Sequence, residues 1–329
     1  MRKLFLFIAV FVMALCANAQ TNQYFWYQGN LMMGNPIAQI DSVTFGEGEP
    51  ADTLHILLPR TIIKTVEVHD TVYITIHDTV CPNAIPEGAL AGEFSVSATK
   101  KVRFSKGNLQ CIMADTIWRF ADNQWETIGK RNTNIETWGD TIDLFGWSSP
   151  NNYYGITMSE NDNDYDGLFV EWGTLIGDNW RTLSGAEWNY LVRSRNNHEI
   201  LIAVGSVNGI NGCIILPDTW IIPQGISFNS GTAAKASVDA YSTVNTYSKE
   251  EWKKMEDAGA IFLPAASIRR GAYYDSNLHQ YFGRYWGSTR TYETTGQAHS
   301  FGYDSSLIDP QYDVPHYGFS VRLVQDVEE

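Results

Sequence analysis

The sequence has few cysteines, and their spacing excludes the common cysteine-based sites. Cys16, Cys81, Cys111 and Cys213 are the only four in 329 residues, with no Cys-x-x-Cys pair and no Cys/His spacing typical of a metal site. In an oxidising compartment two of the last three could pair and leave one over. For Cys111 and Cys213 we favour isolated buried thiols, because free cysteine is often simply buried.

Positive charge is also scarce. The chain has 23 Lys and Arg residues against 37 Asp and Glu residues, a formal net charge of −14. Loss of the two basic residues near the N-terminus with a cleaved signal peptide would leave a charge of about −16. Such an acidic chain is a poor partner for phosphate backbones and for anionic membrane surfaces. We therefore expect no nucleic-acid partner.

Long hydrophobic runs are absent after the first one. Leu4–Leu15 is apolar, but it is shorter than the roughly 20 residues that a membrane span needs. Two basic residues precede it and Ala17-Asn18-Ala19 follows, which together predict a signal peptide over residues 1–19. Cys16 follows the bulky Leu15, where a lipobox has a small residue, and this argues against a lipid anchor. We expect an exported protein, extracellular or associated with the cell surface or outer membrane, with the periplasm as an alternative.

Composition divides the rest of the chain into three parts. Residues 20–48 carry short β-like runs separated by Gly, Asn and Pro, which predict a small N-terminal β segment. Residues 49–93 alternate β-branched and polar residues and repeat the motif His-Asp-Thr-Val at His69 and His77, which predicts an extended linker or stalk. Two histidines eight residues apart on an extended strand lie too far from each other to share a metal. Residues 94–329 are long enough to bury one sizeable core.

Local signals in this main domain predict an α+β fold. Ser184–Glu187 and Ser248–Glu251 are capping boxes, each followed by apolar residues at helical spacing, and Gly259 is placed to end the second helix. Short strands are predicted around residues 98–100, on both sides of the Pro-Asp turn in GCIILPDTWIIPQG, at Ile261–Leu263, and at Phe319–Val324.

Several blocks of this domain resemble known families. WRTLSGAEWNY, from Trp180 to Tyr190, is similar to the Arg-Leu-Pro-Thr-Glu-Ala-Glu-Trp-Glu-Tyr block of formylglycine-generating-enzyme-type domains. FLPAA at 262–266, YWGST at 285–289 and GFSVR at 318–322 resemble the Fibrobacter succinogenes major paralogous domain of Bacteroidetes-type proteins. The match covers residues 94–324, and its pieces are specific in combination. The resemblance implies a C-type lectin-like fold, with a mixed β-sheet core, two helices and long loops that display variable side chains.

The enzymatic activity of the formylglycine-generating enzymes is not expected here. Those enzymes use a cysteine pair in their C-terminal third, and this chain has no cysteine after Cys213. A hydrolase would need a nucleophile beside a base. Ser288, His279, His299 and Asp304 occur in the C-terminal region, but no nucleophile elbow or other placing motif accompanies them. We therefore predict a protein that is not an enzyme.

One acidic turn resembles half of a calcium loop. DNDYDG at 162–167 offers carboxylates at alternate positions and a Gly for the sharp turn. The closing Glu of such a loop would fall at position 173, but that residue is Gly173, and Glu171 lies two short. A solvated acidic turn is therefore the favoured interpretation and no cofactor is expected. Calcium binding is the weaker alternative, with Asp162, Asp164 and Asp166 as its candidate ligands.

The long segment between the last two predicted strands is the candidate binding region. Loops of this length are usually functional or disordered, and its many aromatic residues argue against disorder. Trp286 lies in the shared YWGST block and is predicted to be core, with Tyr285 beside it. Tyrosine offers a large rigid contact area while immobilising only two torsions. We predict an exposed, ligand-contacting surface formed by Tyr273, Tyr274, Asn277, His279, Tyr281, Arg284, Arg290 and Tyr292.

Two classes of function remain open. In the first, the protein is an adhesion or recognition module whose C-terminal loops bind an extracellular glycan or protein. In the second, it is a structural subunit of the cell envelope or of a fibre, and the loops mediate assembly. A module of the first class is expected to stay monomeric in solution, whereas a subunit of the second class is expected to self-associate.

Overall fold

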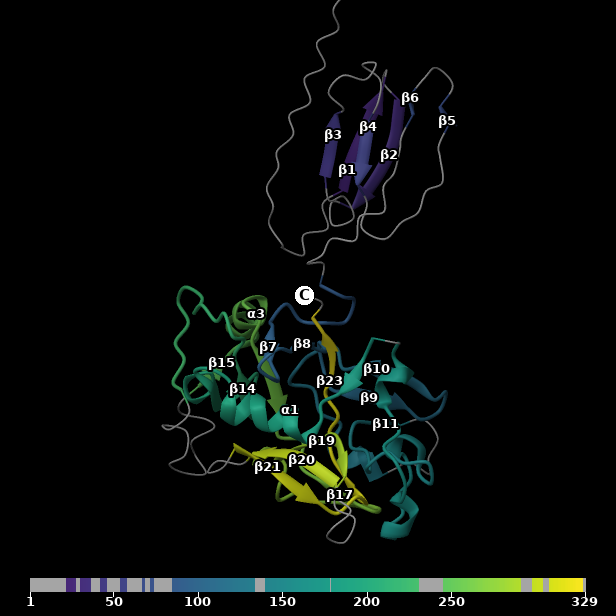
Figure 1. Ribbon diagram of the computed structural model, residues 1–329, viewed down its shortest axis with the longest axis vertical. Helices are drawn as coiled ribbons and strands as arrows, with labels where there is room; N and C mark the ends of the chain where they lie inside the picture. The colour runs from purple at the N-terminus through teal and green to yellow at the C-terminus, as the bar shows by residue number, and fades with distance from the viewer. Residues whose placement is uncertain are drawn as a thin grey trace, which may run out of the picture. The chain divides into compact units, whose positions relative to one another are not determined.

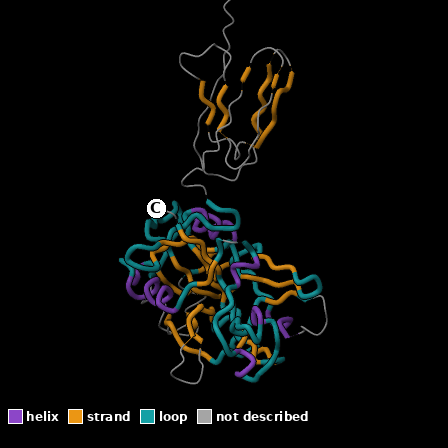
Figure 2. The backbone as a smooth tube through the Cα atoms, turned by 45° about the vertical axis from the view of Figure 1, so that its right-hand side comes forward, coloured by secondary structure: helices purple, strands orange, loops and turns teal. Residues whose placement is uncertain are grey.

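The computed structural model describes the chain in segments (Figures 1 and 2). Before residue 85, and at residues 298–311, only the backbone of short strands is described. The chain splits into two compact units, Met1–Ala84 and Ile85–Glu329. The described residues are 22–27, 30–36, 42–45, 54–57, 67–68, 72–73, 85–133, 140–177, 179–230, 245–290, 298–303 and 308–327.

The N-terminal unit consists of short antiparallel pairs. Strand β1 (Asn22–Tyr27) pairs antiparallel with β2 (Asn30–Pro36). Strands also form where the sequence predicted linker, beyond residue 48. They are β4 (Leu54–Leu57), paired with β3 (Ser42–Phe45), and β5 (Glu67–Val68), paired with β6 (Val72–Tyr73).

The C-terminal unit is built mainly from small sheets, and it is α+β as predicted (Figure 2). Two four-stranded sheets provide its centre. The first has the order β12 (Arg181–Thr182), β23 (Leu323–Asp326), β8 (Lys101–Phe104), β7 (Phe94–Ser95); the second has the order β15 (Thr246–Tyr247), β13 (Ile202–Val207), β14 (Ile210–Ile215), β16 (Ile261–Pro264).

Three further sheets have three strands each. Their orders are β10 (Ile117–Phe120), β9 (Leu109–Ile112), β11 (Thr141–Ile142); then β18 (Tyr273–Tyr274), β17 (Arg269–Arg270), β22 (Tyr317–Gly318); and β19 (Gly283–Arg290), β20 (Ala298–Tyr303), β21 (Ile308–Asp313).

Both predicted helices form, and both begin at their predicted caps. The first is α1 (Gly185–Asn189), continued by a π-helical turn η6 (Tyr190–Ser194), and it packs against β19, β20 and β21. The second, α3 (Lys249–Asp257), ends before Gly259, whose φ of 93° suits glycine. The described residues also contain short 3₁₀ turns: η2 (Gly129–Thr133), η3 (Tyr153–Gly155), η4 (Asp162–Tyr165), η5 (Trp172–Leu175) and η7 (His198–Ile200).

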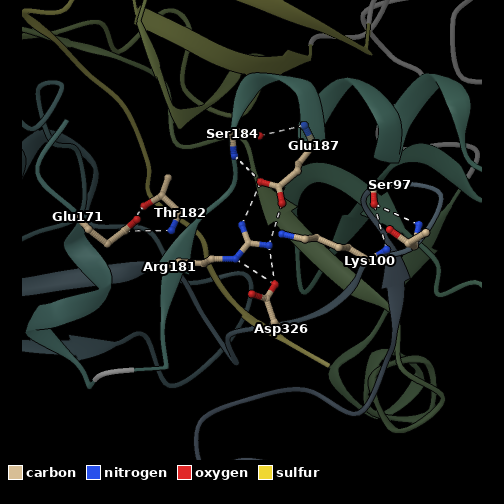
Figure 3. A network of polar contacts seen from close by, with 9 residues as sticks. Ser97, Lys100, Glu171, Arg181, Thr182, Ser184, Glu187 and Asp326 are labelled. Atoms are coloured by element: carbon tan, nitrogen blue, oxygen red, sulfur yellow. Dashed lines mark hydrogen bonds and ion pairs between the residues drawn. The ribbon is translucent and has the colours of Figure 1, made fainter. Parts of the chain in front are cut away.

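The capping box of α1 also anchors the end of the chain (Figure 3). The Ser184 hydroxyl accepts from the Glu187 amide at 3.2 Å, and the Glu187 carboxylate accepts from the Ser184 amide at 2.8 Å. The same carboxylate accepts two hydrogen bonds from Arg181, at 2.9 and 2.8 Å. Arg181 also donates to Asp326 of β23 at 2.6 and 3.0 Å. The WRTLSGAEW block therefore ties a helix start to the C-terminal strand through a bidentate pair.

Tryptophan dominates the core of the C-terminal unit. Trp188 and Trp252, one on each helix, are fully buried beside the two four-stranded sheets. Trp286 and Tyr285 are buried on β19, as the sequence predicted. Cys111 and Cys213 are free and buried, which confirms the expectation for both thiols.

Two strand predictions need correction. No strand forms after the Pro-Asp turn, and Ile221 there is 80% exposed. Prolines flank this stretch closely on both sides, and proline has no amide hydrogen to donate to a strand ladder. Of the predicted strand Phe319–Val324, only Leu323 and Val324 lie in a strand, β23; β22 ends at Gly318, and Phe319 and Ser320 form isolated bridges. No helix among the described residues combines the length and apolarity needed to cross a bilayer.

Candidate functional site

The predicted binding region centres on the small sheet β18–β17–β22, near the lower end of the view in Figure 1, where β17 is labelled. In its register, Arg269 pairs with Tyr274 and with Gly318. Arg270 pairs with Tyr273 and with Tyr317. Successive side chains on a strand point to opposite faces, so each of these two sets of three lies on its own face of the sheet.

The first face belongs to the core. Arg269 is fully buried and donates from Nε to the Leu144 carbonyl at 3.3 Å and from Nη1 to the Gly271 carbonyl at 3.2 Å. Burial lowers the pKa of Arg269 to about 10. Tyr274 is only 8% exposed, and its hydroxyl donates to the Ala266 carbonyl at 3.1 Å. The prediction that Tyr274 is exposed is therefore wrong, because its strand position directs it to the side of Arg269.

The second face is open to solvent. Tyr273 is 55% exposed, and Arg270 beside it is exposed too. The Arg270 guanidinium lies 5.0 Å from the centre of the Tyr317 ring, within cation–π range. Three side chains in cross-strand register, Tyr273, Arg270 and Tyr317, thus form what we call the tyrosine–arginine row. Cross-strand neighbours on one face lie about 5 Å apart at Cβ, so the row is a continuous contact surface.

The acidic turn at 162–167 lies against this sheet. His316, the residue before β22 begins, has its Nδ1 2.6 Å from the Asp162 carboxylate. A methyl group added at Gly271, between β17 and β18, would come within 2.1 Å of the Glu160 carboxylate. Carboxylates of this segment therefore lie beside His316 and Gly271, the chain neighbours of Tyr317 and Arg270.

The three candidate calcium ligands have separate partners. Asp162 pairs with His316, Asp164 accepts from the Ser159 hydroxyl at 2.5 Å, and Asp166 accepts from Arg290 at 2.8 Å. Among the residues that the structure describes, no group of three or more His, Cys, Asp or Glu side chains is arranged to hold a metal ion. Each carboxylate instead fixes the turn to itself or to a neighbouring segment.

Two predicted site arginines prove to be covered. Arg284 is 7% exposed, forms an ion pair with Asp313 at 3.3 Å, and stacks 3.9 Å from the centre of the Phe282 ring. The Arg290 side chain is 6% exposed and donates to the Tyr165 carbonyl at 2.6 Å. Both were predicted to be exposed, and that prediction is wrong for their side chains. A guanidinium can be buried when carbonyls, carboxylates and ring faces satisfy it.

The remaining predicted residues lie in and around the turn after β18. Tyr281 is 46% exposed and Asn277 is exposed, as predicted. His279 is half-buried 6.1 Å from the Tyr274 ring, and burial lowers its pKa. Tyr292 lies outside the described residues.

Sequence reasoning missed Arg270, the middle of the row. A signal existed, because Arg269 and Arg270 are consecutive in a stretch that forms a strand, and only one of two neighbours can face the core. The sequence alone does not say which of the two it is.

No model of a known protein family, no curated protein and no solved structure matches this chain. Fold class and site geometry are therefore the basis for the function proposed below.

Proposed function

We propose that this protein is an exported, non-catalytic recognition module that binds an extracellular glycan or protein through the tyrosine–arginine row. The observation that carries the proposal is the row itself, in register on one face of a sheet whose other face is core: Tyr273 and Arg270 are exposed, and Tyr317 is half-buried beside them. Tyr281, exposed in the following turn, is a candidate further contact. The signal-peptide features of residues 1–19 support export to the cell surface or the extracellular space.

The row has the physical properties of a recognition surface. Tyrosine rings provide flat apolar area for stacking against a sugar ring or an apolar side chain, and each hydroxyl adds one directional hydrogen bond. Arg270 adds a cation and several donors at the centre. The backbone beneath is held by Arg269, so little ordering entropy is lost when a ligand binds.

We further propose that the C-terminal unit has a C-type lectin-like fold of the major paralogous kind. Its support is the α+β architecture together with the places of the resembling blocks. FLPAA contributes to β16, YWGST lies in β19, and GFSVR spans the bridge from β22 towards β23. Arg181 and Glu187 of the WRTLSGAEW block pair with each other, which gives that block a structural role.

The absence of catalysis is part of the proposal, and the two described thiols support it. Thiolate is the nucleophilic form of cysteine, and desolvation disfavours it. Burial raises the pKa of Cys111 to about 11 and raises the pKa of Cys213 further. Neither thiol is therefore suited to act as a nucleophile near neutral pH.

The test compares binding by the mature wild-type chain with binding by a double variant, Arg270→Ser with Tyr273→Ser. Both proteins, purified as residues 20–329, are applied to arrays of glycans and of extracellular proteins. We expect the wild type to bind a ligand on one of the arrays and the double variant to lose at least about tenfold in affinity, because central aromatic and arginine contacts dominate interfaces. The melting temperature should change little, since both side chains are exposed.

Tyr153→Ser is the matched control. Tyr153 is 58% exposed, close to the 55% of Tyr273, but it lies on η3 rather than in the row. This variant should bind like the wild type. Equal binding by the wild type and the double variant, or no binding by the wild type on either array, would show that the proposal is wrong.

A further inference from the structure

A groove on the surface of the C-terminal unit lies at the edge strand β10. The groove has a volume of about 510 Å³, within the range of small-molecule sites. Its wall is aromatic, with Trp118 and Phe120 on β10 and Trp180 just before β12. None of these residues belongs to the sheet that carries the tyrosine–arginine row.

Ring contacts hold this wall in place. Phe120 and Trp180 meet edge to face at 4.7 Å, and Trp118 packs 5.4 Å from Phe145 and 5.7 Å from Tyr154. Phe120 and Trp180 are largely buried, whereas Trp118 is half-buried. The accessible aromatic part of the groove is therefore the half-buried Trp118 ring, which its neighbours hold in place.

Two cations lie on the rim of this wall. Lys106 and Arg119 both line the groove, and both are paired only loosely with Asp122, at 3.7 and 4.0 Å. All three side chains are well exposed, at 47%, 40% and 68%, so these ion pairs contribute little and can exchange for others. The Nε atom of Arg119 is buried and has no hydrogen-bond partner among the described residues. Within a chain of net charge −14, two exposed cations thus lie beside an aromatic wall, with the Asp122 carboxylate as their shared partner.

We propose that this groove binds a sugar ring that carries a carboxylate. The apolar face of a pyranose can stack on the accessible part of the Trp118 indole, and its carboxylate can accept charge-assisted hydrogen bonds from Arg119 and Lys106. Glu87, which is exposed and also lines the groove, offers acceptors for sugar hydroxyls. Neutral sugars lose the ionic contacts, and extended anions without a ring lose the stacking. The inference is independent of the function proposed for the tyrosine–arginine row, because the two surfaces share no residue.

The experiment titrates the mature chain with glucuronate, galacturonate and N-acetylneuraminate, and with glucose and galactose as neutral counterparts. Intrinsic tryptophan fluorescence and saturation-transfer NMR report binding, since two indoles line the groove. We expect at least one acidic sugar to bind saturably and its neutral counterpart to bind about tenfold more weakly. Added salt should weaken the binding of the acidic sugar only, because its contacts with the protein are exposed ion pairs.

Charge-removing variants locate the site. Lys106→Gln and Arg119→Gln should each weaken binding of the acidic sugar by about tenfold and leave the neutral sugar unchanged. The matched control is Lys101→Gln. Lys101 is 45% exposed and lies 3.9 Å from Glu93, almost as Lys106 lies from Asp122, but it does not line the groove. Its variant should bind like the wild type.

Three outcomes would overturn the inference. They are no saturable binding of any acidic sugar, equal affinity for acidic and neutral sugars, and equal weakening by Lys101→Gln and Lys106→Gln. Tyr273→Ser separates this test from that of the tyrosine–arginine row. It should leave acidic-sugar binding unchanged, so failure of one proposal does not imply failure of the other.

Discussion

Asp143 should make the stability of the C-terminal unit depend on pH in an unusual direction. The residue is fully buried next to β11, where its carboxylate accepts from the Asn132 amide at 2.8 Å and from the Ile128 backbone amide at 2.9 Å. Burial raises its pKa from 3.8 to about 6, and the negative charge of Glu126 adds to the rise, while the hydrogen bonds oppose it. The folded protein therefore holds a proton on Asp143 at pH values where the unfolded chain has already released it.

The magnitude follows from linkage. Because the pKa of Asp143 is higher in the folded protein than in the unfolded chain, its contribution to the free energy of unfolding is fully present below pH 3.8. This contribution is lost as the pH rises to about 6. A shift of about two units corresponds to about 3 kcal/mol. Of this, about 2 kcal/mol is lost between pH 4 and pH 7, since the unfolded carboxyl is already partly ionised at the lower value.

Asp143→Asn removes this titration without changing the size of the side chain. The amide cannot accept on both of its polar atoms, so one hydrogen bond is lost, at a cost of about 1–3 kcal/mol at every pH. The variant should therefore have a lower free energy of unfolding than the wild type at pH 4. At pH 7 this difference should have moved by about 2 kcal/mol in favour of the variant, because only the wild type loses stability as the pH rises.

Urea unfolding of both proteins across this pH range gives the measurement. The exposed Asp115 provides the control, because Asp115→Asn removes an acidic group that is not buried. Its stability difference from the wild type should stay nearly constant. If the free energies of unfolding of Asp143→Asn and the wild type differ by the same amount at pH 4 and pH 7, the reasoning is refuted.

Two further predictions concern the adjacent residues Tyr273 and Tyr274 and the two buried cysteines. Tyr274→Ser should lower the free energy of unfolding by about 2–4 kcal/mol, whereas Tyr273→Ser should change it by less than about 0.5 kcal/mol, because only Tyr274 is buried; equal effects in denaturant melts would contradict the register of β17 and β18. In the mature chain carrying Cys81→Ser, a thiol-reactive dye should label nothing until denaturant is added, and should then label Cys111 and Cys213; rapid labelling of the folded protein would mean that these thiols are accessible.

Local interactions explain which parts of the fold could be predicted from the sequence. Both capping boxes consist of a cap and a residue three positions later, and the Ser184 and Ser248 caps form as their spacing predicts. Gly259 ends its helix because few other residues adopt a positive φ. Trp286 could be placed in the core because it lies in the YWGST block that resembles the family. Each of these inferences depends on residues a few positions apart.

Long-range pairing explains the failures. Arg284 and Arg290 are covered because Asp313, Tyr165 and Asp166 lie beside them, and no local pattern reveals those partners. Tyr274 faces inward because β17 presents Arg269 on that side. Exposure of individual side chains within a segment could not be predicted, since it is decided by partners far away in the chain.

The register of β17 and β18 decides which of their side chains face the core and which lie on the candidate surface. If the chain shifted by one residue, the side chains of each strand would exchange faces. Arg270 and Tyr273 would then enter the core, while Arg269 and Tyr274 would face solvent. Two features oppose this shift: Arg269 is held by the Leu144 carbonyl, and Gly318 opposite it leaves the space that its side chain needs, since an added Cβ would lie 2.8 Å from the Arg269 Cβ. Which side chains the candidate surface exposes is therefore decided by a buried arginine and a glycine on the opposite face of the sheet.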